Sequence, residues 1–297
     1  MGLHAAAPLF DAPVAFGGAR CADRSFNDVH ASTPEILDMT TGLVVALSAV
    51  YGLVIGSFLN VVIARVPVGE SVIKPASRCP KCATPLRAYD NIPVLSWLLL
   101  GRKCRSCRTP ISVQYPAVEL GTAVVFSLVA WRIGAHVDLP AHLVAAAGFV
   151  ALAVIDLQTK RLPDRVVFPS VALTAIGFVA AAMIDERFGD LGRAGIGAAA
   201  AFGALLAVHL VRPDGMGFGD VKLAALCGLV LGWHGLADVI VGIYGGFVLG
   251  AVIGVALMAF GRVRRGVTIP FGPFLAAGTM LAVLAGNGLA DRLRDLF

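Results

Sequence analysis

Apolar residues form eight long runs along this chain, and polar residues are concentrated in the segments between them. Most runs are close to the roughly 20 residues that an α-helix needs to cross a bilayer. We therefore predict an all-α polytopic membrane protein with about eight transmembrane helices. Residues 232–235 alone divide the sixth run from the seventh, so one bent helix is an alternative there. The runs cover residues 42–64, 114–131, 139–156, 166–184, 194–211, 219–233, 236–260 and 270–286.

The composition agrees with this pattern. Hydrophobic residues make up 58% of the 297 residues and charged residues 14%, against about 25% charged residues in ordinary soluble domains. With a mean hydropathy of +0.82, a soluble fold would have too little polar surface to cover itself. Gly and Ala are frequent in the runs, for example over residues 195–207, which lets helix backbones approach closely.

The basic residues predict an orientation. If the first run crosses from outside to inside and the chain then alternates, 17 of the 24 Lys and Arg residues fall on the inner side. An excess of Lys and Arg marks the cytoplasmic side, so we predict that the amino terminus lies outside. The net charge of +5 is then mainly a topology signal with some attraction to anionic lipid, and it gives no reason to expect nucleic acid as a partner.

We divide the chain into four parts. Residues 1–38 show no clear period and are predicted to be a disordered extension; the first ten contain no Lys or Arg, unlike a secretory signal. A capping-box pattern at residues 32–35 predicts a helix start, and Met39 leaves the position of the true start open. Residues 39–66 are predicted as the first transmembrane helix, 67–112 as a cytoplasmic metal-binding loop, and 113–297 as the transmembrane core.

The one long polar segment carries two Cys-x-x-Cys pairs, which 21 residues separate. Cys79 and Cys82 form the first pair, and Cys104 and Cys107 the second. This spacing predicts a tetrahedral Zn²⁺ site, and a site filled by four thiolates is structural because no position is left for a reactant. Two disulfides are the alternative, but the basic loop is predicted to lie in the reducing cytosol. Cys227 lies within an apolar run and is predicted to be buried.

Two aspartates stand at the edges of apolar runs, where an ionisable group is costly and therefore a functional candidate. Asp156 closes the third run, and Asp220 ends the sequence Gly-Met-Gly-Phe-Gly-Asp. The predicted orientation places both at cytoplasmic ends, so we predict that they form a catalytic pair. The alternative for Asp156 is a solvated helix end beside Lys160 and Arg161.

A pair of carboxyl groups suits peptide hydrolysis, because two neighbouring carboxyls cannot both ionise cheaply. The ionised one would activate water, and the neutral one would protonate the carbonyl oxygen or the leaving amine. Gly217 and Gly219 remove side chains next to Asp220, which would let an extended substrate approach; a simple glycine hinge is the alternative. Lys222 could pair with a carboxylate or with lipid phosphate, and no serine has a convincing histidine partner in the sequence.

Several motifs follow one another in a specific order over residues 42–290. They are Gly56–Pro67, the two cysteine pairs, Tyr89–Trp97, Pro110–Leu120, Gly217–Leu223 with its Gly-x-Gly-Asp sequence, and Ile269–Leu275. In this order they resemble the bacterial type IV prepilin peptidases, the prepilin leader peptidase/N-methyltransferase family of aspartyl proteases.

The resemblance implies an enzyme that cuts the basic leader of prepilins or pseudopilins after a glycine, at the cytoplasmic face of the membrane. Asp156 and Asp220 match the two catalytic aspartates. Family members with the cysteine-bearing domain also tend to methylate the new amino terminus with S-adenosylmethionine. The sequence does not assign residues to this donor; Asn60, Asn91 and Glu119 are polar candidates.

Two other classes of function stay open at this point. An ion-coupled transporter would use the two aspartates as a relay, and a noncatalytic secretion-assembly factor would not need them. Neither class explains the glycine spacing or the order of the motifs.

Overall fold

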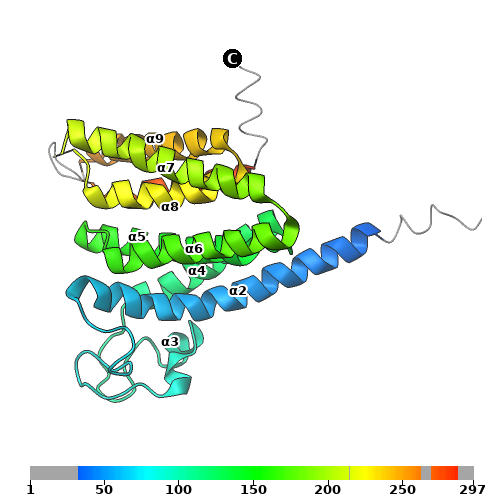
Figure 1. Cartoon of the computed structure of the whole chain (residues 1–297). Coiled ribbons are helices and arrows are strands. Elements are labelled where there is room, and N and C mark those ends of the chain that lie inside the picture. Colours follow the sequence, from blue (N-terminus) through cyan, green and yellow to red (C-terminus); the bar gives the residue numbers. More distant parts are fainter. Residues whose placement is uncertain (1–32, 214, 262–268, 287–297) are drawn as a thin grey trace, which may run out of the picture. The chain divides into compact units, whose positions relative to one another are not determined.

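The computed structural model describes residues 33–213, 215–261 and 269–286, and every long element within these ranges is an α-helix (Figure 1). This confirms the predicted all-α membrane architecture with a small cysteine-bearing insertion. The chain divides into two units at Met39, and the account below concerns Thr40 onward. The long helices are α2 (Thr33–Arg65), α4 (Gln114–Ile133), α5 (Leu139–Thr159), α6 (Asp164–Asp185), α7 (Phe188–Val211), α8 (Phe218–His234), α9 (Leu236–Ala259) and α10 (Gly272–Ala285).

Each of the eight predicted runs corresponds to one helix. Six of the helices, α2, α4, α5, α6, α7 and α9, are long and apolar enough to cross a membrane, and α10 is a shorter apolar helix. The sixth and seventh runs are separate helices, because α8 ends at His234 and α9 begins at Leu236. Leu231 of α8 lies against Gly242 of α9, so the chain folds back at the intervening residue.

The predicted disordered extension falls almost entirely at residues 1–32, which lie outside the described residues, and it stays a prediction. Helix α2 begins at Thr33, inside the predicted capping-box sequence. Three short helices lie between α2 and α4, in the cysteine-bearing loop. They are η1 (Val66–Val68), η2 (Ala88–Asn91) and α3 (Leu95–Leu99).

Helix α8 is the most completely buried of the long helices and lies at the centre of the bundle. Twelve of its 17 residues are buried, and they include Asp220, Cys227 and Trp233. Helices α5, α6, α7, α9 and α10 all contact it. The prediction that Cys227 is buried is confirmed, since its side chain is fully enclosed.

Small residues bring α7 and α8 into backbone contact, as their frequency in the sequence predicted. A Cβ atom on Gly228 would lie 2.2 Å from the carbonyl oxygen of Gly197, and a Cβ on Gly232 would lie 2.5 Å from that of Arg193. Helices α9 and α10 meet in the same way, because a Cβ on Gly278 would lie 2.4 Å from the backbone nitrogen of Gly246. Such close packing supplies the van der Waals contact that holds helices together in lipid.

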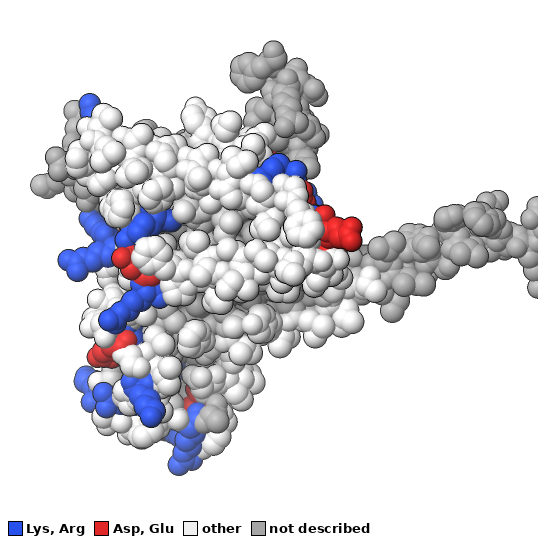
Figure 2. Space-filling model, in the orientation of Figure 1, with Lys and Arg blue, Asp and Glu red and all other residues white. Residues whose placement is uncertain are grey.

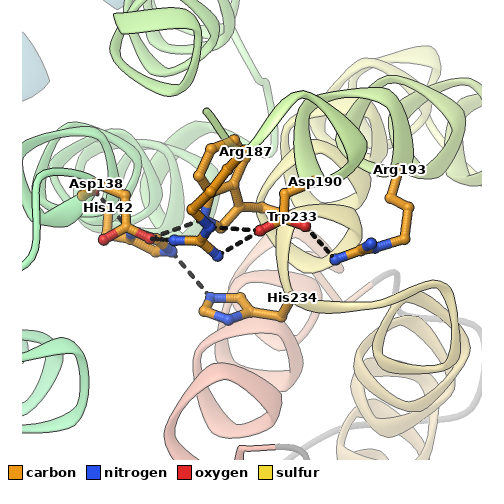
Figure 3. Close-up of polar contacts among 7 residues, drawn as sticks. All are labelled: Asp138, His142, Arg187, Asp190, Arg193, Trp233 and His234. Atoms are coloured by element: carbon orange, nitrogen blue, oxygen red, sulfur yellow. Dashed lines mark hydrogen bonds and ion pairs between the residues drawn. The ribbon is translucent and has the colours of Figure 1, made fainter. Parts of the chain in front are cut away.

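A partly buried polar network joins the start of α5, the start of α7 and the end of α8 (Figure 3). Asp138 stands directly before α5; its Oδ2 accepts a hydrogen bond from Trp233 Nε1 at 2.7 Å and pairs with Arg187 Nη1 at 3.3 Å. The Nε2 atoms of His142 and His234 lie 2.9 Å apart. The network therefore fixes α5 and α8 antiparallel, with the end of α5 beside the start of α8. Asp190 and Arg193 complete the network.

Candidate functional site

Asp156 and Asp220 lie in the wall of one pocket, at the end of the bundle opposite the polar network. Asp156 is in the last turn of α5 and Asp220 in the first turn of α8. The pocket has a volume of about 490 Å³, and both carboxyl groups are buried, with exposed fractions of 4% and 8%. They are close enough to interact electrostatically. The structure thus brings together the two residues that the sequence paired across 64 positions.

A backbone amide at the start of α10 holds Asp156 in place. The Gly272 N–H donates a hydrogen bond to Asp156 Oδ2 at 2.9 Å. A Cβ atom on Gly272 would lie only 2.9 Å from the same oxygen, so only glycine allows this close approach. Orphan N–H groups at a helix start favour a carboxylate. Gly272 belongs to the Ile269–Leu275 motif, whose part in the site the sequence alone did not reveal.

Asp220 is held by its helix and by the glycines before it. Its N–H donates to the Gly217 carbonyl at 3.0 Å, and Gly217 has an extended backbone before α8. Its Oδ1 atom is buried and has no hydrogen-bond partner among the described residues. Gly219 packs against Leu162 of the α5–α6 connection, where a Cβ would lie 2.8 Å from that of Leu162. The missing side chain of Gly219 therefore allows two segments to close around the pocket.

Basic side chains surround this pocket. Lys160, Arg161 and Lys222 line it, and Lys222 forms an ion pair with Asp164 at the start of α6. A carboxylate was one of the two partners that we predicted for Lys222, the other being lipid phosphate. Figure 2 shows that Lys and Arg gather at the end of the bundle that carries the cysteine loop and the α5–α6 connection.

The four loop cysteines form a second candidate site. The Sγ atoms of Cys79, Cys82, Cys104 and Cys107 all lie within 4.8 Å of one another, and those of Cys79 and Cys107 are 3.7 Å apart. A tetrahedral ion with Zn–S bonds of about 2.3 Å holds its sulfurs about 3.8 Å apart. All four thiols are free, so no disulfide joins them. The cluster can therefore hold a metal ion.

The two cysteine pairs share one backbone fold. In each, the first cysteine N–H bonds to the carbonyl of a threonine five residues later, at 3.0 Å for Cys79–Thr84 and 2.8 Å for Cys104–Thr109. The Thr109 hydroxyl, 3.2 Å from Cys107 Sγ, and its backbone N–H lower the pKa of that thiol to about 6. These threonines were missed at the sequence level, although the repeated sequence Cys-x-x-Cys-x-Thr-Pro marks both.

An ion pair joins the second cysteine pair to η2. Arg105 donates from Nη2 to Asp90 Oδ1 at 2.6 Å and from Nε to the same oxygen at 3.0 Å. These hydrogen bonds hold the pKa of Asp90 below its usual value. The Tyr89–Trp97 motif is thereby attached to the metal-binding end of the loop.

The three polar candidates for the methyl donor lie between α2, α4 and this motif. Asn60 Nδ2 donates to the Tyr115 carbonyl at 3.0 Å, while its Oδ1 is buried without a partner among the described residues. Glu119 Oε2 accepts a hydrogen bond from the Val94 N–H at 2.7 Å. Asn91 lines a second pocket, separate from the one that contains the two aspartates.

Comparison with known protein families covers most of the chain. Residues 50–133 match the family described as "Bacterial Peptidase A24 N-terminal domain". Residues 143–259 match the "Type IV leader peptidase family". The first range contains all four clustered cysteines and the second contains both aspartates, so each candidate site lies inside a matched region.

Curated proteins called "Prepilin leader peptidase/N-methyltransferase" are similar over nearly the same range. The protein of Pseudomonas putida is 36% identical over 278 residues, 84% of this chain and 94% of that protein. The protein of Neisseria gonorrhoeae is 36% identical over 282 residues, which are 85% of this chain and 94% of that protein. The protein of Aeromonas hydrophila is 34% identical over 273 residues, which are 82% of this chain and 91% of that protein. No solved structure matches significantly.

Proposed function

This chain belongs to the type IV leader peptidase family, the prepilin leader peptidase/N-methyltransferases, and we propose that Asp156 and Asp220 are its catalytic pair. The observation that carries this proposal is their convergence in one pocket from two helix ends. The pocket also contains Gly217, Gly219 and Lys222, the supporting residues that the sequence selected.

The geometry supports hydrolysis without a covalent intermediate. One carboxyl is ionised and takes a proton from water as the water oxygen attacks the scissile carbonyl carbon; the other gives its proton to the reacting peptide. Two carboxyls that interact share their protons between them, so the proposal gives neither role to a fixed residue. The Gly272 N–H orients Asp156, and packing of Gly219 against Leu162 positions Asp220. Burial of both groups strengthens their electrostatic effect on the reacting bond.

The proposed substrate is a prepilin or pseudopilin whose apolar helix lies in the bilayer. We place the pocket at the cytoplasmic face of the inner membrane because Lys and Arg gather at this end of the bundle (Figure 2). The substrate helix would dock laterally against small residues. Gly197, Gly228 and Gly246 are already covered by the chain's own helices, whereas positions such as Gly195 and Gly203 have open space around them.

The four cysteines would hold a structural Zn²⁺. Four sulfur ligands fit this ion and leave no coordination position for a reactant. The threonine hydroxyls of both pairs lie within hydrogen-bonding distance of a cysteine sulfur, where they support the thiolate form that the metal needs. Removal of the metal with a chelator should therefore unfold the loop while the helices stay intact, which circular dichroism and proteolysis of the loop would show.

The second activity is the N-methylation of the amine that cleavage releases. S-adenosylmethionine, when bound, would supply the methyl group: the amine nitrogen bonds to the methyl carbon as the carbon–sulfur bond breaks, S-adenosylhomocysteine leaves, and the nitrogen gives up a proton to water. The chain contributes the binding site and the proximity of the two reactions.

The experiment that tests the catalytic pair is intact-mass analysis of a cognate prepilin co-expressed with the full chain. The wild type should remove the leader and add one methyl group, whereas Asp156→Asn and Asp220→Asn should leave the leader in place. Asp185→Asn, at an exposed position at the end of α6, is the matched control and should behave as wild type. Processing by both site variants would refute the pair and favour a transport or assembly role.

A further inference from the structure

A second cavity has no part in the peptidase pocket. It has a volume of about 460 Å³ and lies between α2 and the cysteine loop. The Tyr89–Trp97 motif supplies part of its wall, although nothing in the proteolytic reaction uses that motif. Its lining includes Ser57, Val61 and Arg65 of α2 together with Ala76, Asn91 and Pro93 of the loop.

The two cavities open on either side of the end of α2. Arg65, the last residue of the helix, lines the second cavity, and the next two residues, Val66 and Pro67, line the pocket with the aspartates. Consecutive Cα atoms are only about 3.8 Å apart. The end of α2 therefore contributes to the walls of both cavities.

A buried carboxylate organises the wall of this cavity. Glu119 of α4 accepts the Val94 N–H at 2.7 Å and also interacts with the Ser57 hydroxyl. A Cβ atom on Gly56 would lie 2.7 Å from the Glu119 Cα atom, so α2 and α4 touch here. Val94 has a φ of 61°, which is rare for a β-branched residue and persists only where the surroundings enforce it.

Glu119 has no cationic partner within the part of the chain that the structure describes. The side chain is 7% exposed, and none of the ion pairs among these residues includes it. A buried carboxylate without a cation is costly, so a cationic ligand at this place would lower the free energy of the folded state. The orphaned Oδ1 of Asn60, one helical turn after Gly56, adds a buried acceptor on the same side of the bundle.

We propose that this second cavity binds the methyl donor, S-adenosylmethionine. The donor is a small molecule with a flat ring, polar sugar and amino-acid groups, and a positive sulfonium. A pocket of this size suits such a ligand; Val61 and Pro93 offer apolar surface, and Ser57 and Asn91 offer hydrogen bonds. Glu119 behind Ser57 complements the positive charge. Arg65, whose Nη1 donates to the carbonyls of Ser71 and Pro75 at 3.0 and 2.8 Å, adds positive charge to the wall for the carboxylate. The inference rests on the proposed function, and it assigns the N-methylation activity to the second cavity.

The test is equilibrium binding of S-adenosylmethionine to the purified full chain in detergent, with no prepilin present, measured by isothermal titration calorimetry. Ala76→Trp fills the cavity from an exposed loop position, and Ala76→Ser is its matched control at the same place. We expect Ala76→Trp and Asn91→Ala to weaken binding by more than about tenfold, with Ala76→Ser unchanged. All three should still cleave the leader, and Asp156→Asn should still bind the ligand.

Three results would overturn the proposal. The first is wild-type affinity in Ala76→Trp, and the second is no binding by a wild-type chain that cleaves prepilin. The third is loss of leader cleavage in Ala76→Trp, which would assign the cavity to proteolysis. Each of these results differs from the result that would refute the catalytic pair, which is leader cleavage by Asp156→Asn.

Discussion

Gly272→Ala tests the contact between the start of α10 and the carboxyl group of Asp156. The new Cβ atom would lie 2.9 Å from Asp156 Oδ2 and 3.4 Å from Leu162 Cδ2. The carboxyl group must therefore move away from the Gly272 N–H, whose hydrogen bond now measures 2.9 Å. Backbone conformation is no obstacle, since Gly272 is not among the residues with positive φ.

The expected loss follows from the type of bond. A hydrogen bond to a charged group contributes about 1.5–3 kcal/mol. If this bond holds the carboxyl group in its reactive position, its loss lowers kcat/KM for leader cleavage by roughly 10- to 160-fold, at 1.36 kcal/mol for each factor of ten. The affinity for S-adenosylmethionine should not change, because neither Gly272 nor Asp156 lines the second cavity.

The assay is cleavage of a purified prepilin by the full chain in detergent, followed by mass spectrometry over time. Gly245→Ala in α9 is the matched control, since nothing lies within 4 Å of its Cβ position, and it should cleave as the wild type does. Activity of Gly272→Ala within about twofold of wild type, less than about 0.5 kcal/mol, would refute the reasoning. Size-exclusion profiles and thermal unfolding of both variants separate this effect from misfolding.

The remaining predictions concern stability and pH. Trp233→Phe removes the indole N–H from the buried aspartate before α5 and should lower the free energy of unfolding by roughly 1.5–3 kcal/mol, whereas exposed Trp131→Phe should not. Gly228→Ala places a Cβ 2.2 Å from a carbonyl oxygen of α7 and should lower the free energy of unfolding by about 1–3 kcal/mol. Gly203→Ala has open space at its Cβ position and should be neutral or mildly stabilising. Thermal unfolding in detergent measures the stability of these four variants. Arg105 lowers the pKa of the Asp90 carboxyl. The ion pair between η2 and the second cysteine pair is therefore fully formed above the ordinary carboxyl pKa of about 3.9. It is lost only as the pH falls through the lowered pKa of Asp90. The protection factors of the α3 amides, which are exchange rates corrected for the intrinsic effect of pH, should therefore stay constant from pH 7 to pH 5 in the wild type. Protection factors at pH 7 in Asp90→Asn that equal those of the wild type would contradict this role.

The sequence determined the parts of this protein that depend on local pattern. Long apolar runs predicted the helices because an α-helix satisfies its backbone polar groups within one segment, as a bilayer requires. The spacing of Cys79, Cys82, Cys104 and Cys107 predicted a metal-binding cluster, because each close pair can present two sulfurs from one turn. The charges at the edges of the runs singled out Asp156 and Asp220, since such groups are rare where they are costly.

Tertiary structure alone decided which distant groups meet at these positions. No period in the sequence reveals that Gly272 donates to Asp156, or that Gly219 makes room for Leu162, because these contacts join helices and connections far apart in the chain. The same holds for the two cavities that the end of α2 separates, and for the network between Asp138 and Trp233. Local patterns fix which segments are helical and which faces are apolar, whereas side-chain packing between helices fixes their order and depth. The reactive geometry of this enzyme is set at that second level.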